Sequence, residues 1–468
     1  MALETLKEYC GVMAVWNAEN AAELTYHGLY SLQHRGQEAA GIVSTDGDKF
    51  YRRLGLGTLT QVFSSPDMLQ QLHGNAAIGH NRYSTTGSNS QFNIQPLSAM
   101  LRDGPVAIGH NGNLVNTKKL RKELQDDGAI FQSTTDSEIL IHLMAHSKKE
   151  KLLDRFIEAL GRVEGAYSLV MMSQDAVFAV RDPHGWRPLV IGRKGDSFVV
   201  ASESCALDLL GYELIRDVRP GELIVLDREG MHSISFAKNG KTHFCIFELI
   251  YFSRPDSRVL GDSVDKFRRK MGKNLAMEHP ADADIVISVP DSSNTAALGF
   301  SQRSDAKFEM GLIRNHYVGR TFIQPTSAMR EMGVKLKFNP VEGVLKDRRV
   351  VVVEDSIVRG TTLRKLTDLL RGAGAKEVHV RVSSPPIRFP CYYGMDFPSR
   401  EELIANNHTV DEIREIIGVD SLGYLSVEKL LDSVPQGEGQ GYCTACFTGN
   451  YPIPPNGDEE TGTKERYS

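Results

Sequence analysis

One segment of the chain places a buried strand, an acidic pair and a hydroxyl-rich loop directly after one another. Four consecutive valines, Val350 to Val353, are typical of a strand buried on both faces of a sheet. Glu354 and Asp355 follow at its carboxyl end, and residues 356–362 add hydroxyls, an arginine and a glycine. Leucines at helical spacing come next: Leu363, Leu366, Leu369 and Leu370. This order predicts a parallel sheet with a phosphate-binding loop at its edge.

The chemistry of this loop suits a sugar phosphate. Backbone N–H groups, the hydroxyls of Ser356, Thr361 and Thr362, and the helix N-terminus can hold a phosphate, while Gly360 lets the backbone approach it. The adjacent carboxylates repel each other unless something neutralises them, so Mg²⁺ or ribose hydroxyls are expected there. Any one of these features alone is typical of an ordinary strand, turn and helix with a solvated acidic turn.

The segment resembles the phosphoribosylpyrophosphate (PRPP) motif of the type I phosphoribosyltransferases. The resemblance implies that the acidic pair contacts the ribose hydroxyls and Mg²⁺, and that the loop binds the 5-phosphate. The family's usual pair is Asp-Asp, so Glu354 is a departure from it. The residues of this segment that match PRPP-binding positions are Glu354, Asp355, Ser356, Arg359, Gly360, Thr361 and Thr362.

Two further segments extend this resemblance. The sequence Pro290-Asp291-Ser292-Ser293 follows the predicted strand Ile285–Ser288 and resembles the family's pyrophosphate loop. By resemblance, Asp291, Ser292 and Ser293 contact PRPP, and Ser292 is a Mg²⁺ ligand beside Glu354 and Asp355. The stretch from 320 to 337 resembles the lid that closes over PRPP, with Lys335 as a pyrophosphate contact; a solvated basic loop is the alternative interpretation.

Length and charge limit the classes of function. A chain of 468 residues predicts two or three domains, and a net charge of -5 gives no electrostatic case for binding nucleic acid or an anionic membrane. No apolar run approaches the roughly 20 residues of a membrane helix. Residues 1–9 lack the apolar stretch of a secretory signal. We therefore expect a cytoplasmic protein whose partners are small molecules or copies of itself.

The chain divides into two parts with different periodicity. Up to about Asp227, short apolar strands with a few helices predict an α+β layered domain. From about Cys245, strands alternate with helices, which predicts a doubly wound parallel sheet with ligands at the strand carboxyl ends. We predict a first domain at 10–240, a second domain at 241–450 and a disordered tail at 451–468.

Polar motifs cluster in the first part, at 34–37, 79–85, 110–114 and 134–138. Each is expected at a turn beside an apolar strand, where site residues collect. His34 and Arg35 are expected to brace the fold, and His110 to be a turn residue. Cys10 precedes the predicted strand Gly11–Trp16, and by itself would be a packed small hydrophobe.

Together, Cys10 and these motifs resemble the glutaminase domain of the N-terminal-nucleophile amidotransferases, which implies an αββα layered fold. By resemblance, the Cys10 thiolate attacks the side-chain amide of glutamine, and the Asn111 side chain and the Gly112 N–H hold the oxyanion. Glutamine is expected at Arg82, Thr85 and Asp136, with Arg82 on its α-carboxylate and Asp136 on its α-amino group.

In that family the cysteine is the first residue of the mature chain, and its free α-amino group is the general base. An amine with a pKa near about 7.7–8.0 can serve as a base at neutral pH. The resemblance therefore implies that residues 1–9 are a propeptide, removed by cleavage between Tyr9 and Cys10. An unprocessed N-terminus would leave the nucleophile without its base.

Six cysteines without a secretion signal favour catalytic or metal-binding roles over a disulfide framework. Only Cys443 and Cys446 form a Cys-x-x-Cys pair, and Cys205 is expected to be a buried structural thiol. A glutaminase followed by a PRPP-binding domain resembles the glutamine PRPP amidotransferases, whose iron-sulfur subgroup has four cluster ligands. They match Cys245, Cys391, Cys443 and Cys446. Four thiolates could equally hold zinc, and only the resemblance favours iron.

The resemblance implies the committed step of purine synthesis. Ammonia released from glutamine displaces pyrophosphate at C1 of PRPP and gives 5-phosphoribosylamine. It also implies one Mg²⁺ and one 4Fe-4S cluster per subunit, a homotetramer, and feedback inhibition by purine nucleotides. A non-catalytic PRPP-sensing regulator would not need the Cys10 set, and a glutaminase joined to another synthase would lack the motif at 354–362. Both alternatives fit the sequence less well.

Overall fold

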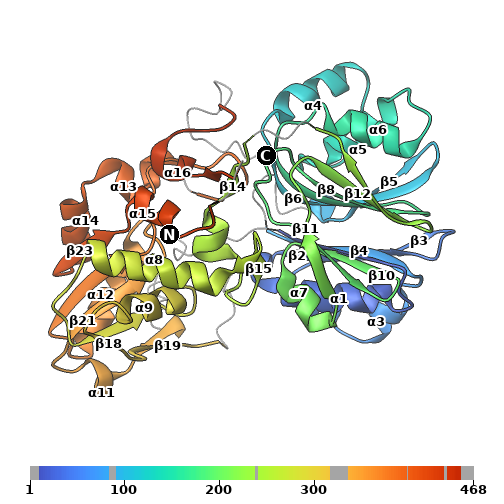
Figure 1. Ribbon diagram of the computed structural model, residues 1–468. Coiled ribbons are helices and arrows are strands. Elements are labelled where there is room, and N and C mark those ends of the chain that lie inside the picture. Colours follow the sequence, from blue (N-terminus) through green and yellow to red (C-terminus); the bar gives the residue numbers. More distant parts are fainter. Residues whose placement is uncertain are drawn as a thin grey trace.

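The computed structural model describes residues 10–83, 91–237, 241–316, 336–397, 399–436 and 440–454. Two bodies lie side by side in Figure 1, the first coloured blue to green and the second yellow to red. Within the described ranges, no helix combines the length and the apolar character needed to cross a membrane.

Two antiparallel sheets form the centre of the first body. The first sheet has the order β11 (Glu213–Asp217), β9 (Val190–Lys194), β10 (Ser197–Ala201), β1 (Gly11–Trp16), β4 (Ala76–Arg82), β2 (Ala39–Thr45) and β3 (Phe50–Leu56). The second has the order β13 (Gly230–Ser235), β12 (Glu222–Asp227), β8 (Val177–Arg181), β7 (Gly165–Met172), β6 (Gly104–Leu114) and β5 (Leu97–Leu101).

Apolar side chains fill the space between these sheets and under the outer helices. Val12 and Ile78 of the first sheet belong to the same buried cluster as Val170 of the second. Helices α1 (Ala21–Ser31) and α7 (Ser204–Leu210) cover the outer face of the first sheet, and α5 (Glu138–His146) and α6 (Leu152–Leu160) cover that of the second (Figure 1). The order of layers is therefore αββα, as predicted.

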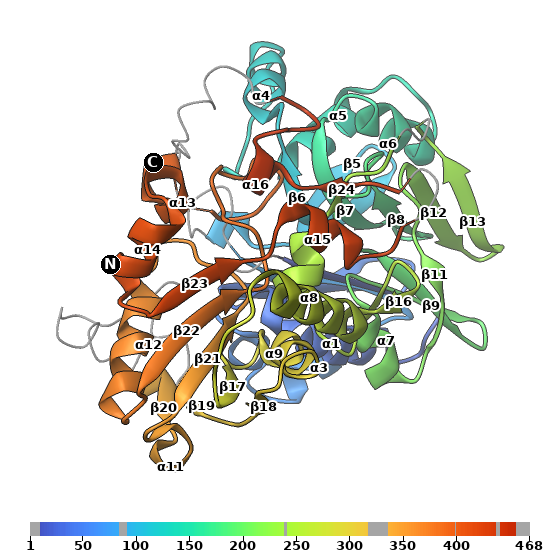
Figure 2. The same cartoon turned by 60° about the vertical axis from the view of Figure 1, so that its left-hand side comes forward.

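The second body is built on a parallel sheet of five strands. Its order is β18 (Lys307–Phe308), β17 (Ile285–Ser288), β21 (Arg349–Glu354), β22 (Glu377–Val382) and β23 (Ser421–Tyr424). Figure 2 shows these strands beside α8 (Val264–Glu278), α9 (Asn294–Ser301), α12 (Thr361–Gly372) and α14 (Val410–Ile417).

The valine run of β21 explains why helices cover both faces of this sheet. Val351 and Val353 pack in the cluster that contains α8 and α9, whereas Val350 and Val352 pack in the cluster that contains α12 and α14. All four valines are fully buried. Alternate residues of a strand point to opposite faces, so an unbroken apolar run requires apolar cover on both sides.

Shorter elements complete the described chain. In the first body they are η1 (Gln33–Arg35), α2 (Leu59–Val62), α3 (Asp67–Gln70), η2 (Gln91–Asn93) and α4 (Thr117–Asp126). In the second they are β14 (Phe244–Cys245), η3 (Glu248–Phe252), β15 (Arg258–Val259), β16 (Asp262–Ser263), β19 (Leu312–Arg314), β20 (Phe338–Pro340), α11 (Glu342–Leu345), η4 (Arg400–Glu402), α13 (Ile404–Asn407), α15 (Val427–Asp432), β24 (Tyr442–Cys443) and α16 (Ala445–Thr448).

A buried charge network joins the two bodies. The Arg35 guanidinium is fully buried and pairs with Glu203 of the first body and Glu248 of the second. Glu248 also pairs with the buried Arg187, with 3.4 Å between Oε1 and Nη1. Burial alone would lower the pKa of Arg35, but the charges of Glu203 and Glu248 raise it. Arg35 therefore braces the fold, as expected, and does so across the junction.

The prediction of disorder for residues 451–468 is wrong for the first residues of this tail. The Tyr451 hydroxyl donates to the Pro390 carbonyl at 2.8 Å. The Ile453 backbone N–H donates to the Tyr393 hydroxyl at 2.9 Å, and this hydroxyl donates to the Ile453 carbonyl. These hydrogen bonds, with the edge contact between the Tyr393 and Tyr451 rings, hold residues 451–453 in a way that local composition does not reveal. Residues 455–468 lie outside the described part of the chain.

Candidate active sites and a four-cysteine site

Cys10 lies immediately before β1 and is almost fully buried, with 8% of its surface exposed. Its Sγ lies 3.6 Å from the Tyr83 carbonyl, which accepts the thiol proton. Burial raises the pKa of Cys10 to about 11, and the Arg82 charge only partly opposes this effect. The thiolate is the nucleophilic form, so the thiol needs a nearby base to react at neutral pH.

The sheet brings charged groups predicted to bind glutamine towards Cys10. Strands β1 and β4 are antiparallel with Gly11 opposite Asn81, which places Arg82 beside the start of β1. Arg82 and Asp136 both act on the Cys10 thiol electrostatically. Asp136 also accepts the Leu114 backbone N–H at 2.9 Å, so it lies at the end of β6. Thr85, the third predicted glutamine contact, lies outside the described residues.

Asn111 and Gly112 lie near that end of β6. Asn111 is fully buried, yet neither its side-chain nitrogen nor its side-chain oxygen has a hydrogen-bond partner within the described residues. Leaving a buried polar group unpaired costs about 1–3 kcal/mol, so this amide is available to a ligand. Gly112 has φ +151°, and a Cβ there would stand 2.0 Å from the Ala166 carbonyl oxygen. Only glycine fits this position.

The structure corrects two expectations about this region. The motifs 79–82 and 110–114 lie in strands β4 and β6 and not at turns, and His110 is a buried strand residue. Hydrogen bonds make this burial tolerable: His110 Nδ1 lies 2.9 Å from Ser137 Oγ, and its backbone N–H donates to the Gln95 side chain. Buried polar groups with such partners are stable inside a sheet, so the polar spacing was a poor signal for a turn.

The predicted pyrophosphate loop and the acidic pair meet at one edge of the parallel sheet. β17 and β21 are parallel neighbours, so the residues that follow them share that edge. Ser292 Oγ donates to the Asp355 carboxylate at 2.6 Å, and Ser293 Oγ donates to the Glu354 carboxylate at 3.2 Å. Ser356 Oγ donates to the other oxygen of Asp355 at 2.5 Å.

Burial makes it unfavourable for Glu354 and Asp355 to be ionised at the same time. Burial and the neighbouring charge of Asp355 raise the pKa of Glu354 well above its ordinary value. Burial also raises the pKa of Asp355, against the lowering effect of its serine hydrogen bonds and of the Arg268 charge. A divalent cation would reverse both shifts, because an adjacent positive charge favours the ionised carboxylates.

Helix α12 begins directly at the predicted phosphate loop. Gly360 precedes it with φ +78°, in the left-handed region that favours glycine, and no side chain in the described part of the chain caps the helix there. The first-turn N–H groups of this 12-residue helix can therefore face an anion. Thr361 and Thr362 occupy that turn, while Arg359 pairs with Glu402 at 2.8 Å. Lys335 lies outside the described residues.

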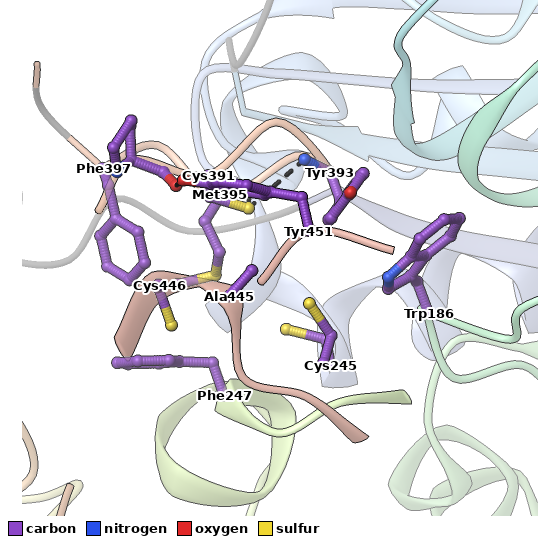
Figure 3. Close-up of a pocket in the computed structure, with 12 residues that line it drawn as sticks. Trp186, Cys245, Phe247, Cys391, Tyr393, Met395, Phe397, Ala445, Cys446 and Tyr451 are labelled. Atoms are coloured by element: carbon purple, nitrogen blue, oxygen red, sulfur yellow. Dashed lines mark hydrogen bonds between the residues drawn. The ribbon is translucent and has the colours of Figure 1, made fainter. Parts of the chain in front are cut away.

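The four predicted ligand cysteines line one cavity, shown in Figure 3. Cys245 in β14 is directly opposite Cys443 in the parallel strand β24. Cys446 comes from α16, and Cys391 from the loop after β22. The other residues that line this cavity are aromatic or apolar: Trp186, Phe247, Pro390, Tyr393, Met395, Phe397, Ala445 and Tyr451.

Two observations describe what this cavity can hold. Backbone N–H groups of Tyr393 and Met395 donate to Cys391 Sγ at 3.3 and 3.4 Å, as suits a sulfur that carries negative charge. Burial raises the pKa of Cys245 to about 11 and that of Cys443 to about 12, so four thiolates need a positive partner. Within the described ranges, no group of three or more histidine, cysteine or carboxylate side chains is arranged to hold a metal ion. The chemistry of four thiolate donors suits either an iron-sulfur cluster or one zinc ion.

Several residues around these sites were not found from the sequence. Arg268 is buried on α8, donates to the Leu249 and Ser253 carbonyls, and interacts electrostatically with Asp355. Its position four residues after Val264 on an apolar helix face was a usable signal. Trp186 and Arg187, which lie between β8 and β9, gave no periodic signal for their place beside the cysteines.

Cys205 is the remaining described cysteine apart from Cys10. It is 4% exposed in α7, and its thiol lies 4.0 Å from the Glu203 carboxylate. Burial raises the pKa of Cys205 to about 12. This agrees with the expectation of a buried structural thiol.

Comparisons with known proteins agree with both halves of the chain. A glutamine amidotransferase domain family matches residues 80–209, and a phosphoribosyl transferase domain family matches residues 270–385. Amidophosphoribosyltransferase of Bacillus subtilis is 48% identical over 454 residues, covering 96% of this chain and 95% of that protein. The chloroplastic amidophosphoribosyltransferase 2 of Arabidopsis thaliana is 50% identical over 97% of this chain and 81% of its own length.

Solved structures show the same likeness. The glutamine PRPP amidotransferase from B. subtilis, complexed with ADP and GMP, matches with a TM-score of 0.91 and 47% identity. This match covers 96% of the present chain and 98% of that one. The structure of an allosteric regulatory enzyme of purine biosynthesis also matches with a TM-score of 0.91, at 48% identity.

Proposed function

The chain belongs to the amidophosphoribosyltransferase family, the PRPP amidotransferases of purine biosynthesis, and we propose that it divides the reaction of this family between its two bodies. Glutamine is hydrolysed at Cys10, and the ammonia reaches C1 of PRPP inside the protein. The products are glutamate, pyrophosphate and 5-phosphoribosylamine. The observation that carries the first half is Asn111, a buried amide without a partner in the described residues, near the end of β6.

At the first site, Arg82 binds the glutamine α-carboxylate and Asp136 its α-amino group, which brings the side-chain amide to Cys10. The thiolate attacks the amide carbon, and the oxyanion is held by the Asn111 side chain and the Gly112 N–H. Collapse of this intermediate releases ammonia and leaves a thioester. Water then hydrolyses the thioester to glutamate. The free amine of Cys10 accepts the thiol proton and returns it to the leaving ammonia.

At the second site, Asp291, Ser292 and Ser293 contact pyrophosphate, and residues 356–362 bind the 5-phosphate. Lys335 is a further pyrophosphate contact. Mg²⁺, when bound by Ser292, Glu354 and Asp355, neutralises the buried carboxylates and the charge of the leaving pyrophosphate. Ammonia attacks C1 as the bond to pyrophosphate breaks. An enclosed site protects this step, because water would compete with ammonia for C1.

We propose that the four-cysteine site holds one 4Fe-4S cluster per subunit through Cys245, Cys391, Cys443 and Cys446. The four cysteines that line one cavity, and their match to the ligand positions of the family's iron-sulfur subgroup, support this assignment. One Mg²⁺ per subunit, a homotetramer, a cytoplasmic location and inhibition by purine nucleotides complete the proposal. The nucleotide part is supported by the B. subtilis relative, which was solved with ADP and GMP.

Measuring pyrophosphate release from PRPP tests the overall proposal. The purified protein should release pyrophosphate with glutamine and also with ammonia as the nitrogen source. Release with ammonia but not with glutamine would contradict the assignment of the first site. Absence of release with both would contradict the second.

Removal of one cluster ligand should remove the cluster. We expect Cys443→Ser to lose the visible absorbance and bound iron of protein purified without oxygen, because one thiolate of four is replaced by a weaker ligand. We also expect a lower melting temperature, since the cluster ties β14 to β24. Absorbance spectra, elemental analysis and thermal melting check these results.

Cys205→Ser is the matched control, because Cys205 is buried outside the cavity and its loss should leave iron and colour unchanged. Zinc without iron in the anaerobically purified wild type would overturn the cluster assignment.

The active chain should begin at Cys10. An internal Cys10 has an amide nitrogen that cannot accept the thiol proton, and burial raises the pKa of its thiol to about 11. Intact-mass measurement and N-terminal sequencing of the active protein check this. A chain that still begins at Met1 or Ala2 with full glutaminase activity would show that the mechanism is misassigned.

A further inference from the structure

The loop that carries Cys391 is held by side chains of the glutaminase body. Asn113 Nδ2 donates to the Tyr392 carbonyl at 2.9 Å, and the Arg187 guanidinium donates to the Tyr393 carbonyl at 2.7 Å. In the same loop, two backbone N–H groups donate to Cys391 Sγ. A single turn of chain therefore carries a cysteine of the four-cysteine site and is bound to the other body.

Aromatic packing fixes the position of this loop. Trp186 is fully buried and stacks on the Tyr393 ring, with 4.5 Å between ring centroids and 23° between planes (Figure 3). The Trp186 carbonyl also accepts the Cys245 backbone N–H at 3.0 Å. Tyr393 and Trp186 share a buried cluster with Val115 and Ala166, which lie just after β6 and in β7. Movement of the loop would disturb the end of β6.

That end of β6 carries the two groups proposed to hold the oxyanion. Asn113 follows Gly112 directly and is two residues from Asn111. Strand β5 pairs with β6 only over residues 104–108, whereas β7 pairs with it as far as Leu114. Residues 109–114 are thus supported by a strand on one side only. Side chains supply the other supports of this strand end: Gln95 accepts the His110 N–H, Asp136 accepts the Leu114 N–H, and Asn113 donates to the Tyr392 carbonyl. Of these three, the hydrogen bond from Asn113 is the one that comes from the cysteine loop.

We propose that Asn113 is a positioning residue for the glutaminase reaction, through which the four-cysteine site holds Asn111 and Gly112 in place for the oxyanion. The inference rests on the proposed roles of those two residues and of the cysteines. The metal group would then have two roles: it would hold β14 to β24, and it would fix the loop that supports the oxyanion donors. Loss of the group would release the Cys391 loop. Asn113 would then lose its partner, and Asn111 and Gly112 would be misplaced.

Kinetics of Asn113→Ala test the first half. Misplaced oxyanion donors weaken transition-state binding more than glutamine binding. We expect kcat for glutamine to fall about three- to tenfold, as suits the loss of one hydrogen bond, with KM nearly unchanged and ammonia-dependent synthesis retained. The matched control is Asn116→Ala, because the Asn116 amide donates to the Arg162 carbonyl at the same distance of 2.9 Å, within the glutaminase body. This variant should keep the kcat for glutamine.

Metal retention tests the second half by a measurement other than activity. Wild type and both variants are purified without oxygen and treated with an alkylating glutamine analogue that modifies Cys10 and places its ketone oxygen at the oxyanion position. Decay of the visible absorbance in air is then followed with and without the analogue. A filled oxyanion site should steady the strand end and the loop, so decay should slow about two- to tenfold in wild type and Asn116→Ala. In Asn113→Ala the analogue should give no protection.

Equal protection of wild type and Asn113→Ala would overturn the inference and leave the proposed function intact. If the protein holds zinc, release of zinc to a chromogenic chelator replaces the absorbance in the same comparison. Failure of the analogue to label Cys10, or absence of any bound metal, would instead overturn the proposed function, and this inference with it.

Discussion

Cys10→Ala should abolish glutamine-dependent synthesis and retain ammonia-dependent synthesis. Alanine removes the sulfur that forms the covalent intermediate, so we expect the glutamine-dependent rate to fall at least about a thousandfold. The acidic pair and the phosphate loop lie in the other body, on the parallel sheet, and keep their geometry. Pyrophosphate release with each nitrogen source measures both activities on one preparation.

Cys205→Ala provides the matched control for this result. It also removes a buried thiol from the first body, but one that lies in α7 and outside both proposed sites. We expect this variant to keep both activities and to melt at a slightly lower temperature. Loss of ammonia-dependent synthesis in a folded Cys10→Ala protein would contradict the separation of the two sites.

Asp355→Asn should remove synthesis with either nitrogen source. Asparagine has nearly the same shape, and its one carbonyl oxygen can still accept the Ser292 hydroxyl, so the change removes the charge and the acceptor of the Ser356 hydroxyl. Without that charge the site loses a Mg²⁺ ligand and a contact to ribose. We expect a fall of at least about a hundredfold with glutamine and with ammonia, the size expected when one preorganised electrostatic group is lost.

Two further measurements make this second result specific. Asp368→Asn changes an exposed aspartate on α12, the helix that begins at the phosphate loop, and should have little effect. Labelling of Cys10 by the alkylating glutamine analogue should persist in Asp355→Asn, which would show that the first body is folded. Full activity of this variant would rule out the proposed PRPP site.

The sequence predicted those features whose signals are local. The valine run of β21, the acidic pair and the leucines of α12 follow one another along the chain, and the structure places them as expected. Periodicity also predicted an α+β layered domain for the first body, because each strand and helix carries its own apolar pattern, whereas the αββα order was implied by the family resemblance. The sheet edge at 290–293 and 354–362 could be predicted because carboxyl ends of parallel strands share one edge.

Features that depend on contacts between residues far apart in the sequence could not be predicted in this way. Spacing alone could not group Cys245 with Cys391, and only the family resemblance did so. His110 was assigned to a turn because its polar neighbours suggested one; its partner Ser137 lies 27 residues away and makes a buried strand position acceptable. Asn113 and Tyr392 are likewise 279 residues apart, and no local sequence pattern predicts their contact.

The charge network around Arg35 bears on whether the protein can be divided into working parts. The chain reads as two modules, yet the carboxylates that balance Arg35 come from both of them, Glu203 before the boundary and Glu248 after it. A fragment ending near residue 240 would keep the guanidinium and lose Glu248. The guanidinium would keep Glu203, but one of its two carboxylate partners would be replaced by water. We therefore expect the glutaminase body alone to be less stable than the same body in the whole chain.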